Sequence, residues 1–486
     1  MEAIEETDRI LRRLAEVEPS ALALEEGPEE RRALTERVCS FADDLLDGLA
    51  ERRVWSREPG ARDELIEQGM PEEPADLDKV LDLVAREVDG PGLQPASGGH
   101  LGYIAGGGIY PGALGDYLAA VTNRYAGVHY AGPGAVHVEN LLLRWLCGLV
   151  DFPEQALGTF TSGGSIATLV AVVCARDARG IRASKVESSP IYVTAQTHHC
   201  VTKAIAIAGL AEAPLRKIPM DANYRMDSAA LSAQIAEDRA AGLEPFLLVA
   251  SAGTTDTGAL DPLEELADIA REEGLWYHVD AAYGGAFLLV DHMRPKFRGI
   301  ERADSVVIDP HKGFFLPYGS GAVLLRDKEH LRPSHGLRGV YLQDATDDLD
   351  EPSPADLSPE LTRHFRGLRM WLPFQLHGLG RYRAALEEKL LLCNLFHERA
   401  KAMGFEVGPQ PDLSVALFHW VPRDGSDPNA FNQALLQKIL DDGRVFLSST
   451  TIDGVFWIRV AVLCFRTHRD RIEALLAVLA RETKAP

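Results

Sequence analysis

Two residues that could do chemistry together, a carboxylate and a lysine, each follow a short apolar run within residues 278–315. Asp280 ends the run HVD, and Lys312 stands in DPHKG. An ionised carboxylate can hold the proton on a pyridine nitrogen, and a deprotonated lysine can hold an aldehyde as a Schiff base. Pyridoxal 5'-phosphate (PLP) needs both groups. The pair therefore predicts a PLP site, where we expect partial burial to lower the pKa of Lys312.

A third element, GTFTSGGSIATL, runs from a short strand through a Gly-Gly-Ser turn into a helical stretch. Gly164 and Ser165 would then lie at a helix N-terminus, where backbone N–H groups and the helix dipole favour a phosphate. Each motif alone has a plainer interpretation: an ordinary N-cap, an ordinary strand end, or a turn with a surface lysine. Their combination in one chain favours the PLP site.

Five ordered motifs carry a resemblance to a known family. TSGGSIATL, QTHHCVTKA, SAGTTDTGALDP, HVDAAYGGAF and DPHKG resemble those of the group II PLP-dependent amino acid decarboxylases, which include aromatic amino acid, histidine and glutamate decarboxylases. The resemblance extends over most of the chain. It implies the fold type I of PLP-dependent transferases, PLP as cofactor, an L-amino acid substrate and a homodimer with active sites at the subunit interface. A monomer whose N-terminal helices pack on their own domain is the alternative assembly.

The resemblance implies a role for each motif residue. Lys312 resembles the Schiff-base lysine, and Asp280 resembles the partner of the pyridinium nitrogen. His198 resembles the histidine that stacks on the cofactor ring and reaches the substrate carboxylate, with His199 as the alternative. Each could instead be structural, as a helix-terminus histidine would be. The other cofactor-binding positions are Gly164, Ser165, Thr255, Ala282, Asp309 and His311.

Two further residues are expected to reach the substrate. Tyr103, in HLGYIAGGG, resembles an aromatic residue of the pocket, although it could be a loop tyrosine under a small domain. Arg459, in FWIRVAVLC, has a family counterpart that can contact the substrate carboxylate, although it could be a strand arginine with its head in water. Aromatic amino acids are the commonest substrates in this branch. Ile104 and Gly127 stand where bulky aromatic residues line that pocket, which leaves a smaller or acidic substrate open.

One loop departs from the family pattern. In aromatic amino acid decarboxylases, a loop before the motif written here as RHFRGLRMW carries a tyrosine that delivers a proton to the α-carbon. Residues 342–363 contain no tyrosine or phenylalanine, and Tyr341 precedes them. The proton could come from His198, from Tyr125 of the partner subunit or from water, or oxygen could intercept the intermediate and give an aldehyde. Gly313 also replaces a tryptophan after the lysine, which leaves the substrate preference open.

Composition disfavours several classes of protein. The chain has 486 residues, too many for one core, and a formal net charge of −22, which argues against a nucleic-acid backbone as partner. Its six cysteines lack ligand-like spacing, so we expect reduced cytoplasmic thiols and no metal site. The acidic N-terminal segment does not resemble a signal peptide, and no run of about 18 apolar residues could cross a bilayer.

The chain divides into three predicted parts. Residues 1–94 form an N-terminal helical arm, in which 29–55 and 76–89 have amphipathic periodicity. Residues 95–335 form a large PLP-binding domain, where strand-like runs alternate with helical stretches. This alternation predicts an α/β fold with a mainly parallel sheet, which the family resemblance sets at seven strands. Residues 336–486 form a mobile loop and a small α+β domain.

We therefore expect a PLP-dependent L-amino acid decarboxylase, a carboxy-lyase acting through Lys312. The alternatives are a decarboxylating aldehyde synthase, a fold type I aminotransferase or carbon–sulfur lyase, and an inactive relative that binds PLP. His198 in its QTHHCV context and DPHK favour the decarboxylase. A nucleotide-binding protein would need GxGxxG or GxxxxGK[ST] after a strand, and neither occurs in the predicted cofactor domain.

Overall fold

The computed structural model describes residues 2–56, 65–67, 69–336 and 351–483. They form two compact units, Met1–Leu93 and Gln94–Pro486. The second unit contains two sheets, each with its own hydrophobic core. The exact bounds of the three predicted parts stay a prediction.

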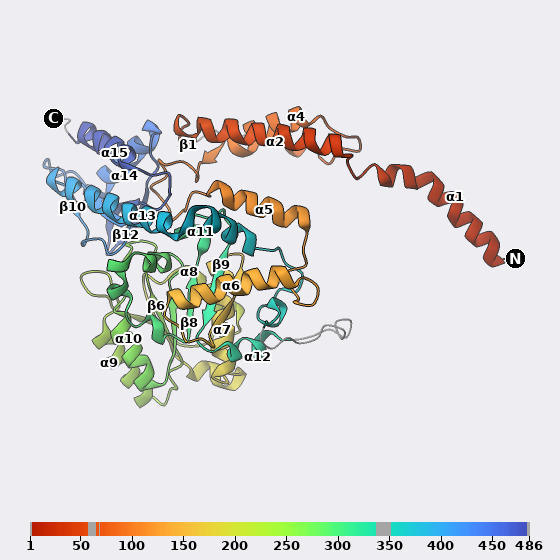
Figure 1. Cartoon of the computed structure of the whole chain (residues 1–486). Coiled ribbons are helices and arrows are strands. Elements are labelled where there is room, and N and C mark those ends of the chain that lie inside the picture. The colour runs from red at the N-terminus through yellow and green to blue at the C-terminus, as the bar shows by residue number, and fades with distance from the viewer. Residues whose placement is uncertain (1, 57–64, 68, 337–350, 484–486) are drawn as a thin grey trace. The chain divides into compact units, whose positions relative to one another are not determined.

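The first unit is mostly helical (Figure 1). Its helices and strands are α1 (Glu2–Leu22), α2 (Pro28–Asp47), β1 (Trp55–Ser56), α4 (Leu77–Leu83), a π-helical continuation (Val84–Asp89) and β2 (Gly92–Leu93). The Asp76 side chain caps α4 by accepting the Lys79 N–H, and an Arg37–Asp78 ion pair joins α2 to α4. None of the residues of α2 is buried. The predicted amphipathic segments are therefore helical, but the first ends at Asp47.

A mainly parallel seven-stranded sheet forms the centre of the second unit, as predicted. The strand order is β3-β9-β8-β7-β6-β4-β5. Only β9 runs against its neighbours, since it pairs antiparallel with both β3 and β8, so β3 and β8 point the same way. The strands are β3 (Leu157–Thr161), β4 (Ile191–Thr194), β5 (Leu215–Ile218), β6 (Leu247–Ser251), β7 (Trp276–Asp280), β8 (Ser305–Ile308) and β9 (Gly321–Leu325).

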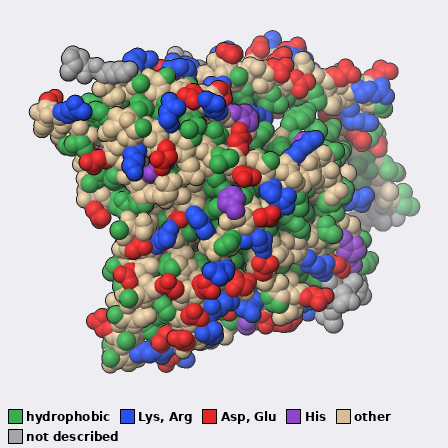
Figure 2. Space-filling view, turned by 60° about the vertical axis from the view of Figure 1, so that its left-hand side comes forward, with side chains coloured by type: hydrophobic (Ala, Val, Ile, Leu, Met, Phe, Trp, Pro, Cys, Tyr) green, Lys and Arg blue, Asp and Glu red, His purple; other side chains and the backbone are tan. Residues whose placement is uncertain are grey.

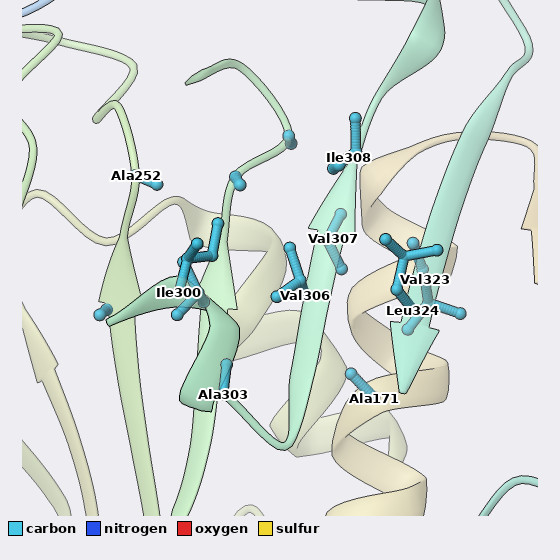
Figure 3. Packing of buried hydrophobic residues seen from close by; sticks show 14 of the residues in the cluster. Ala171, Ala252, Ile300, Ala303, Val306, Val307, Ile308, Val323 and Leu324 are labelled. Atoms are coloured by element: carbon cyan, nitrogen blue, oxygen red, sulfur yellow. The ribbon is translucent and has the colours of Figure 1, made fainter. Parts of the chain in front are cut away.

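This sheet forms because its central strands are apolar on both faces. Every residue of β3, β6, β8 and β9 is buried, as expected for a sheet covered by helices. In Figure 3, Val306 and Val307 on β8 lie beside Val323 on β9, and Ala171 on α7 lies nearby. The helices around the sheet are α5 (Tyr110–Thr122), α6 (Pro133–Leu149), α7 (Gly164–Ala178), α8 (His199–Ile207), α9 (Ser228–Ala240), α10 (Leu263–Glu273), α11 (Pro310–Gly313) and α12 (Arg332–His335).

A smaller antiparallel sheet follows, with strand order β10-β11-β13-β12. The long helix α13 bends at Gly378, whose φ is 66°. Phe396 on this helix packs with Phe418 and Ile458 on the sheet, and their burial creates the second core. The elements are α13 (Gly367–Ala402), β10 (Glu406–Val407), β11 (Val415–His419), α14 (Pro428–Asp442), β12 (Ser448–Ile452), β13 (Val455–Ala461) and α15 (Arg469–Glu482).

The surface carries charges of both signs, interspersed over the face shown in Figure 2. Among the described helices, none combines the length and the apolar character that crossing a membrane requires. All six cysteines are free thiols.

Candidate active site

A cavity of about 360 Å³ lies where strands of the large sheet end. Because β3, β4, β6, β7 and β8 all point the same way, their carboxyl ends meet at one edge of the sheet, the usual place for a ligand in such folds. The cavity walls are the segments that leave these strands. In order they are 162–166, 196–200, 251–255, 280–283 and 309–312.

Nine of the predicted site residues line this one cavity, although they are far apart in sequence. They are Gly164, Ser165, His198, Thr255, Asp280, Ala282, Asp309, His311 and Lys312. The described lining does not include His199, Tyr103 or Arg459.

The turn before α7 forms a tight cradle. A Cβ atom on Gly164 would lie 2.8 Å from Asp309 Oδ2, so a larger residue would crowd that carboxylate. The amides of Ile166 and Ala167 donate to the Gly163 carbonyl. The amides of Gly164 and Ser165, which come before them, are the first N–H donors at the N-terminus of α7. Such donors, beside the positive end of the helix dipole, suit a phosphate.

Lys312 is held by a carboxylate. Its Nζ lies 3.0 Å from Asp309 Oδ2, and Asp309 itself is buried. Burial acts to lower the pKa of Lys312, but the charges of Asp309 and Asp280 outweigh it, so the pKa is raised above its usual value. The protein by itself therefore does not show the lowered pKa of Lys312 that burial led us to expect. A raised pKa means that Lys312 must lose its proton before it can act as a nucleophile.

His198 is positioned as the N-cap of α8. Its Nδ1 accepts the Cys200 N–H at 3.3 Å, so a neutral ring carries its hydrogen on Nε2. Burial lowers the pKa of His198 further than the nearby Asp280 raises it, which keeps the ring neutral near pH 7. His198 therefore offers an N–H donor at the cavity. His199 packs against it, with ring centroids 4.1 Å apart.

Asp280 ends β7 with one oxygen engaged. Its Oδ1 accepts the Ala282 N–H at 3.1 Å, which fixes the carboxylate at the strand end. The other oxygen remains available to the cavity. Ala282, two residues later, lines the same cavity with a small side chain.

Arg459 is buried, with its head bonded to the backbone. Its Nε donates to the Asp256 carbonyl at 2.8 Å, and its terminal nitrogens donate to the Thr255 and Gly102 carbonyls and to Ser448 Oγ. The alternative of an arginine with its head in water is therefore excluded. Arg459 supports the wall at Thr255 from behind. Its contact with substrate stays a prediction.

Tyr103 lies on the surface rather than in the described lining. Its side chain is 55% exposed, and its ring packs 5.6 Å from Phe446 and 6.1 Å from His100. Its substrate role also stays a prediction.

Gly313 and Gly127, the two glycines that stand where the family pattern has aromatic residues, are required by close packing. A Cβ on Gly313 would lie 2.3 Å from the Ala286 Cβ, and one on Gly127 would lie 2.1 Å from the Leu361 carbonyl oxygen. Neither position has room for an aromatic side chain with this backbone. The predicted loop of residues 342–363 falls partly outside the described residues, and so does Tyr341.

The cavity also has wall residues that sequence reasoning did not single out. Gln196 and Cys200 stand in the QTHHCV motif, so the motif itself was the available signal. Tyr283 follows HVDAA, and its hydroxyl bonds to Ser414 Oγ at 2.6 Å, which ties the wall to the segment before β11. Ser251 and Thr254 stand in the SAGTTDTGALDP motif, so there too the motif was the available signal.

Comparisons with known proteins bear on this site. The model of the pyridoxal-dependent decarboxylase conserved domain matches residues 59–420. An aromatic-L-amino-acid decarboxylase of Bacillus atrophaeus is 32% identical, over 94% of this chain and 96% of that protein. A phenylacetaldehyde synthase of Petunia hybrida is 29% identical, over 90% of each.

Solved structures share the fold. The crystal structure of Oryza sativa TDC with PLP and tryptamine has a TM-score of 0.88 at 24% identity, covering 94% of this chain and 98% of that one. The crystal structure of mouse CSAD in apo form has a TM-score of 0.85 at 26% identity, covering 94% and 99%.

Proposed function

The chain belongs to the family of pyridoxal-dependent decarboxylases, and we propose that Lys312, Asp280 and His198 carry out its reaction. As a member of this family, the protein is a PLP-dependent lyase that removes carbon dioxide from an amino acid. One observation carries the assignment of residues. The three side chains reach a single cavity from three different strand ends. When bound, PLP draws electrons from the substrate α-carbon, which lets the bond to the carboxylate break.

The cavity residues fit this cofactor. The Gly164 and Ser165 amides would hold the phosphate, because they stand at a helix N-terminus in a cradle that a Cβ would fill. Asp280 would hold the proton of the ring nitrogen, and Lys312 would hold the aldehyde carbon. Ala282 and His198, the small residue and the ring that the family uses on the two faces of the cofactor, both line the cavity.

Asp309 and Lys312 form the proton-handling pair. Lys312 is protonated in the protein alone, and its ammonium pairs with the Asp309 carboxylate, whose Oδ2 lies 3.0 Å from Nζ. His311, whose Nδ1 bonds to the Ser320 carbonyl, stands beside the same carboxylate. Asp309 thus holds Lys312 in place and in its protonated form until a ligand enters the cavity.

His198 orients the substrate. The Nε2–H of its neutral ring can donate to the substrate carboxylate, holding the bond that breaks in the orientation that favours loss of carbon dioxide over loss of the α-proton. The same N–H is a candidate donor of the proton that the α-carbon takes up afterwards. Tyr125 of the partner subunit and water are the other candidates.

An aromatic amino acid is the proposed substrate. Relatives named for aromatic amino acids support it. Gly127 does not argue for a smaller substrate, because close packing against Leu361 requires glycine there. Tyr103 and Arg459 remain the proposed substrate-side residues.

A decarboxylating aldehyde synthase is the second candidate. The stretch 342–363 has no tyrosine, and a phenylacetaldehyde synthase is among the relatives. In that reaction the amino acid, oxygen and water give an aldehyde, carbon dioxide, ammonia and hydrogen peroxide. Oxygen takes up the two electrons that the α-carbon loses.

We also propose a cytoplasmic homodimer, built from the arm of residues 1–94, the cofactor domain of 95–335 and the small domain of 336–486. The free cysteines support a reducing compartment. One face of α5 supports the dimer, because it exposes large apolar side chains that a lone protein seldom presents together. They are Tyr110, Leu114, Tyr117, Leu118 and Val121. Light scattering after gel filtration would test the dimer.

The decisive experiment incubates purified, PLP-loaded protein with a panel of L-amino acids and follows carbon dioxide, amine, aldehyde and peroxide together. Carbon dioxide with an equal amount of amine, from an aromatic substrate, is the expected result. Aldehyde with an equal amount of peroxide would establish the second candidate instead. Carbon dioxide from none of the substrates would contradict both.

A further inference from the structure

Residues 251–261 form a closed loop that supplies one wall of the cavity, and we call them the wall loop. Ser251 ends β6, and it lines the cavity together with residues 253–255. The chain then turns back, so that Leu260 pairs with Ala252 in an antiparallel bridge. The place of this wall therefore depends on what holds the two ends of the loop together.

Asp261 joins the two ends of the wall loop. Its backbone N–H donates to the Ser251 carbonyl at 3.0 Å, and its Oδ2 accepts the Ser251 N–H at 2.7 Å. The other carboxylate oxygen, Oδ1, accepts the Met226 N–H at 2.8 Å, which ties the loop to the segment before α9. Asp261 is only 3% exposed, and backbone amides of two different segments occupy both of its oxygens.

The tip of the wall loop is held separately. Arg459 donates to the carbonyls of Thr255 and Asp256. Asp261 thus holds the base of the loop and Arg459 holds its tip. Neither residue belongs to the described lining of the cavity, so each acts on the cavity through the loop.

An ionised carboxylate suits the two amides at the base better than any neutral group of the same shape. It accepts through both oxygens, whereas a protonated carboxyl group or an asparagine amide turns a donor toward one of the two N–H groups. Burial raises the pKa of Asp261 to about 6, although the two amide hydrogen bonds act to lower it. Asp261 is therefore mostly ionised at pH 7 and loses its charge in mildly acidic solution.

Charged and titratable groups of several segments surround Asp261. Asp221 raises its pKa and Arg225 lowers it, both less than burial does. Arg225 and Lys296 each pair with Asp412. The other groups are Glu264, Glu265, Tyr277 and Arg298. Arg225 and Lys296 are thus engaged by another carboxylate, and the two amides are the partners that the charge of Asp261 serves.

We infer that Asp261 is a positioning residue for the cofactor: its carboxylate holds the base of the wall loop, and with it Thr255, in the place that binds PLP. The inference rests on the proposed function, since it takes the cavity as the PLP site. Asp261 acts through the Ser251 and Met226 amides and does not touch the cofactor. The wall loosens when the carboxylate gains a proton, so the cofactor is held less well in acid.

The test measures the affinity of the full-length apo-protein for PLP at pH 7.5 and at pH 5. Asp261→Asn keeps the shape of the side chain but loses one of the two amide hydrogen bonds. Because that bond is made to a charged group, and because affinity falls with the fraction of protein whose wall is in place, the variant should bind PLP roughly 10-fold more weakly at pH 7.5. At pH 5 the wild-type carboxyl group is itself protonated, so the two proteins should bind PLP about equally.

Asp238→Asn is the matched control. Asp238 is also a buried carboxylate, 1% exposed, and it accepts from Tyr192 Oη and from the Arg216 guanidinium. It is not among the described residues that line the cavity. This variant should have a lower thermal midpoint than the wild type but the wild-type affinity for PLP at both pH values.

Other outcomes separate the failures. An equal loss of PLP affinity in both variants would mean a merely structural role and would overturn the inference, as would unchanged binding by Asp261→Asn at pH 7.5 or a loss that persists at pH 5. A wild type that binds no PLP would contradict the proposed function itself. Should Asp261→Asn not fold, hydrogen exchange of the wild type, corrected for the intrinsic effect of pH, takes its place. Protection of the Ser251 and Met226 amides must then fall between pH 7 and pH 5, and constant protection would overturn the inference.

Discussion

The buried ion pair of Glu139 and Arg363 gives the sharpest test of how the site is supported. Neither side chain is exposed to solvent. The Arg363 guanidinium donates to Glu139 Oε2 and to the carbonyls of Ala126 and Phe160, and Phe160 lies on β3 just before the phosphate cradle. Arg363 thus ties the segment after residues 337–350 to the strand that leads into the cavity.

Glu139→Gln removes the charge with little change of shape. It leaves the buried Arg363 guanidinium with only the partly exposed Glu360, whose Oε2 lies 3.9 Å from Nε, so the cost should fall near the lower end of the about 3–5 kcal/mol for losing one partner of a buried pair. Glu139 Oε1 also accepts the Arg366 and Gly367 amides at 2.9 and 3.2 Å, so these two amides should report the loss directly. A cost of about 3 kcal/mol corresponds to roughly 100-fold faster exchange through local opening.

Hydrogen exchange of the apo-protein, read by mass spectrometry on a peptide that spans residues 364–370, measures this cost. Glu273→Gln is the matched control. It breaks the Arg239–Glu273 pair, whose side chains are 47% and 36% exposed, and should cost at most about 1 kcal/mol. If Glu139→Gln accelerated exchange no more than the control does at its own site, the reasoning from burial would be refuted.

Three further predictions concern the site. Lys312→Ala should abolish borohydride-trapped labelling of the protein by PLP, and a persistent label would show that another lysine holds the cofactor. Because burial lowers the pKa of His198 from 6.5, kcat should show an acid limb whose midpoint lies below pH 6.5; in His198→Gln, which cannot titrate, kcat should drop by about 100-fold and lose this acid limb. An acid limb unchanged in the variant would assign the titration to another group. Gly313→Ala should lower the free energy of unfolding by about 1–3 kcal/mol, seen as a lower thermal midpoint, because its Cβ would lie 2.3 Å from that of Ala286; an unchanged midpoint would mean that the backbone yields freely.

The sequence was sufficient to predict the place of a site residue where that residue directly follows the end of a strand. Asp280 and Lys312 each follow an apolar run, and parallel strands bring such ends together, so their meeting in one cavity could be expected. The edge strand β5 was not predicted. Half of its sequence LRKI is charged and its first residues are only partly buried, so it lacks the apolar run that marks the central strands.

What the sequence could not supply are the long-range charges and contacts. The pKa of Lys312 depends on Asp309 and Asp280 at specific distances, and the expectation of a lowered value considered burial alone. The partners of Arg459 are backbone carbonyls on other segments, which no side-chain pattern encodes.

Arg459 also has a consequence for the order in which the protein is made. Its guanidinium bonds to the Thr255 carbonyl across 204 positions of sequence, and to Gly102 across 357. During synthesis the N-terminal part of a chain emerges first, so the cradle and the strand ends of the large sheet leave the ribosome well before β13. The wall at Thr255 therefore lacks its support until the last strand has been translated. A nascent chain that stops before Arg459 should retain PLP poorly even with all nine predicted lining residues present.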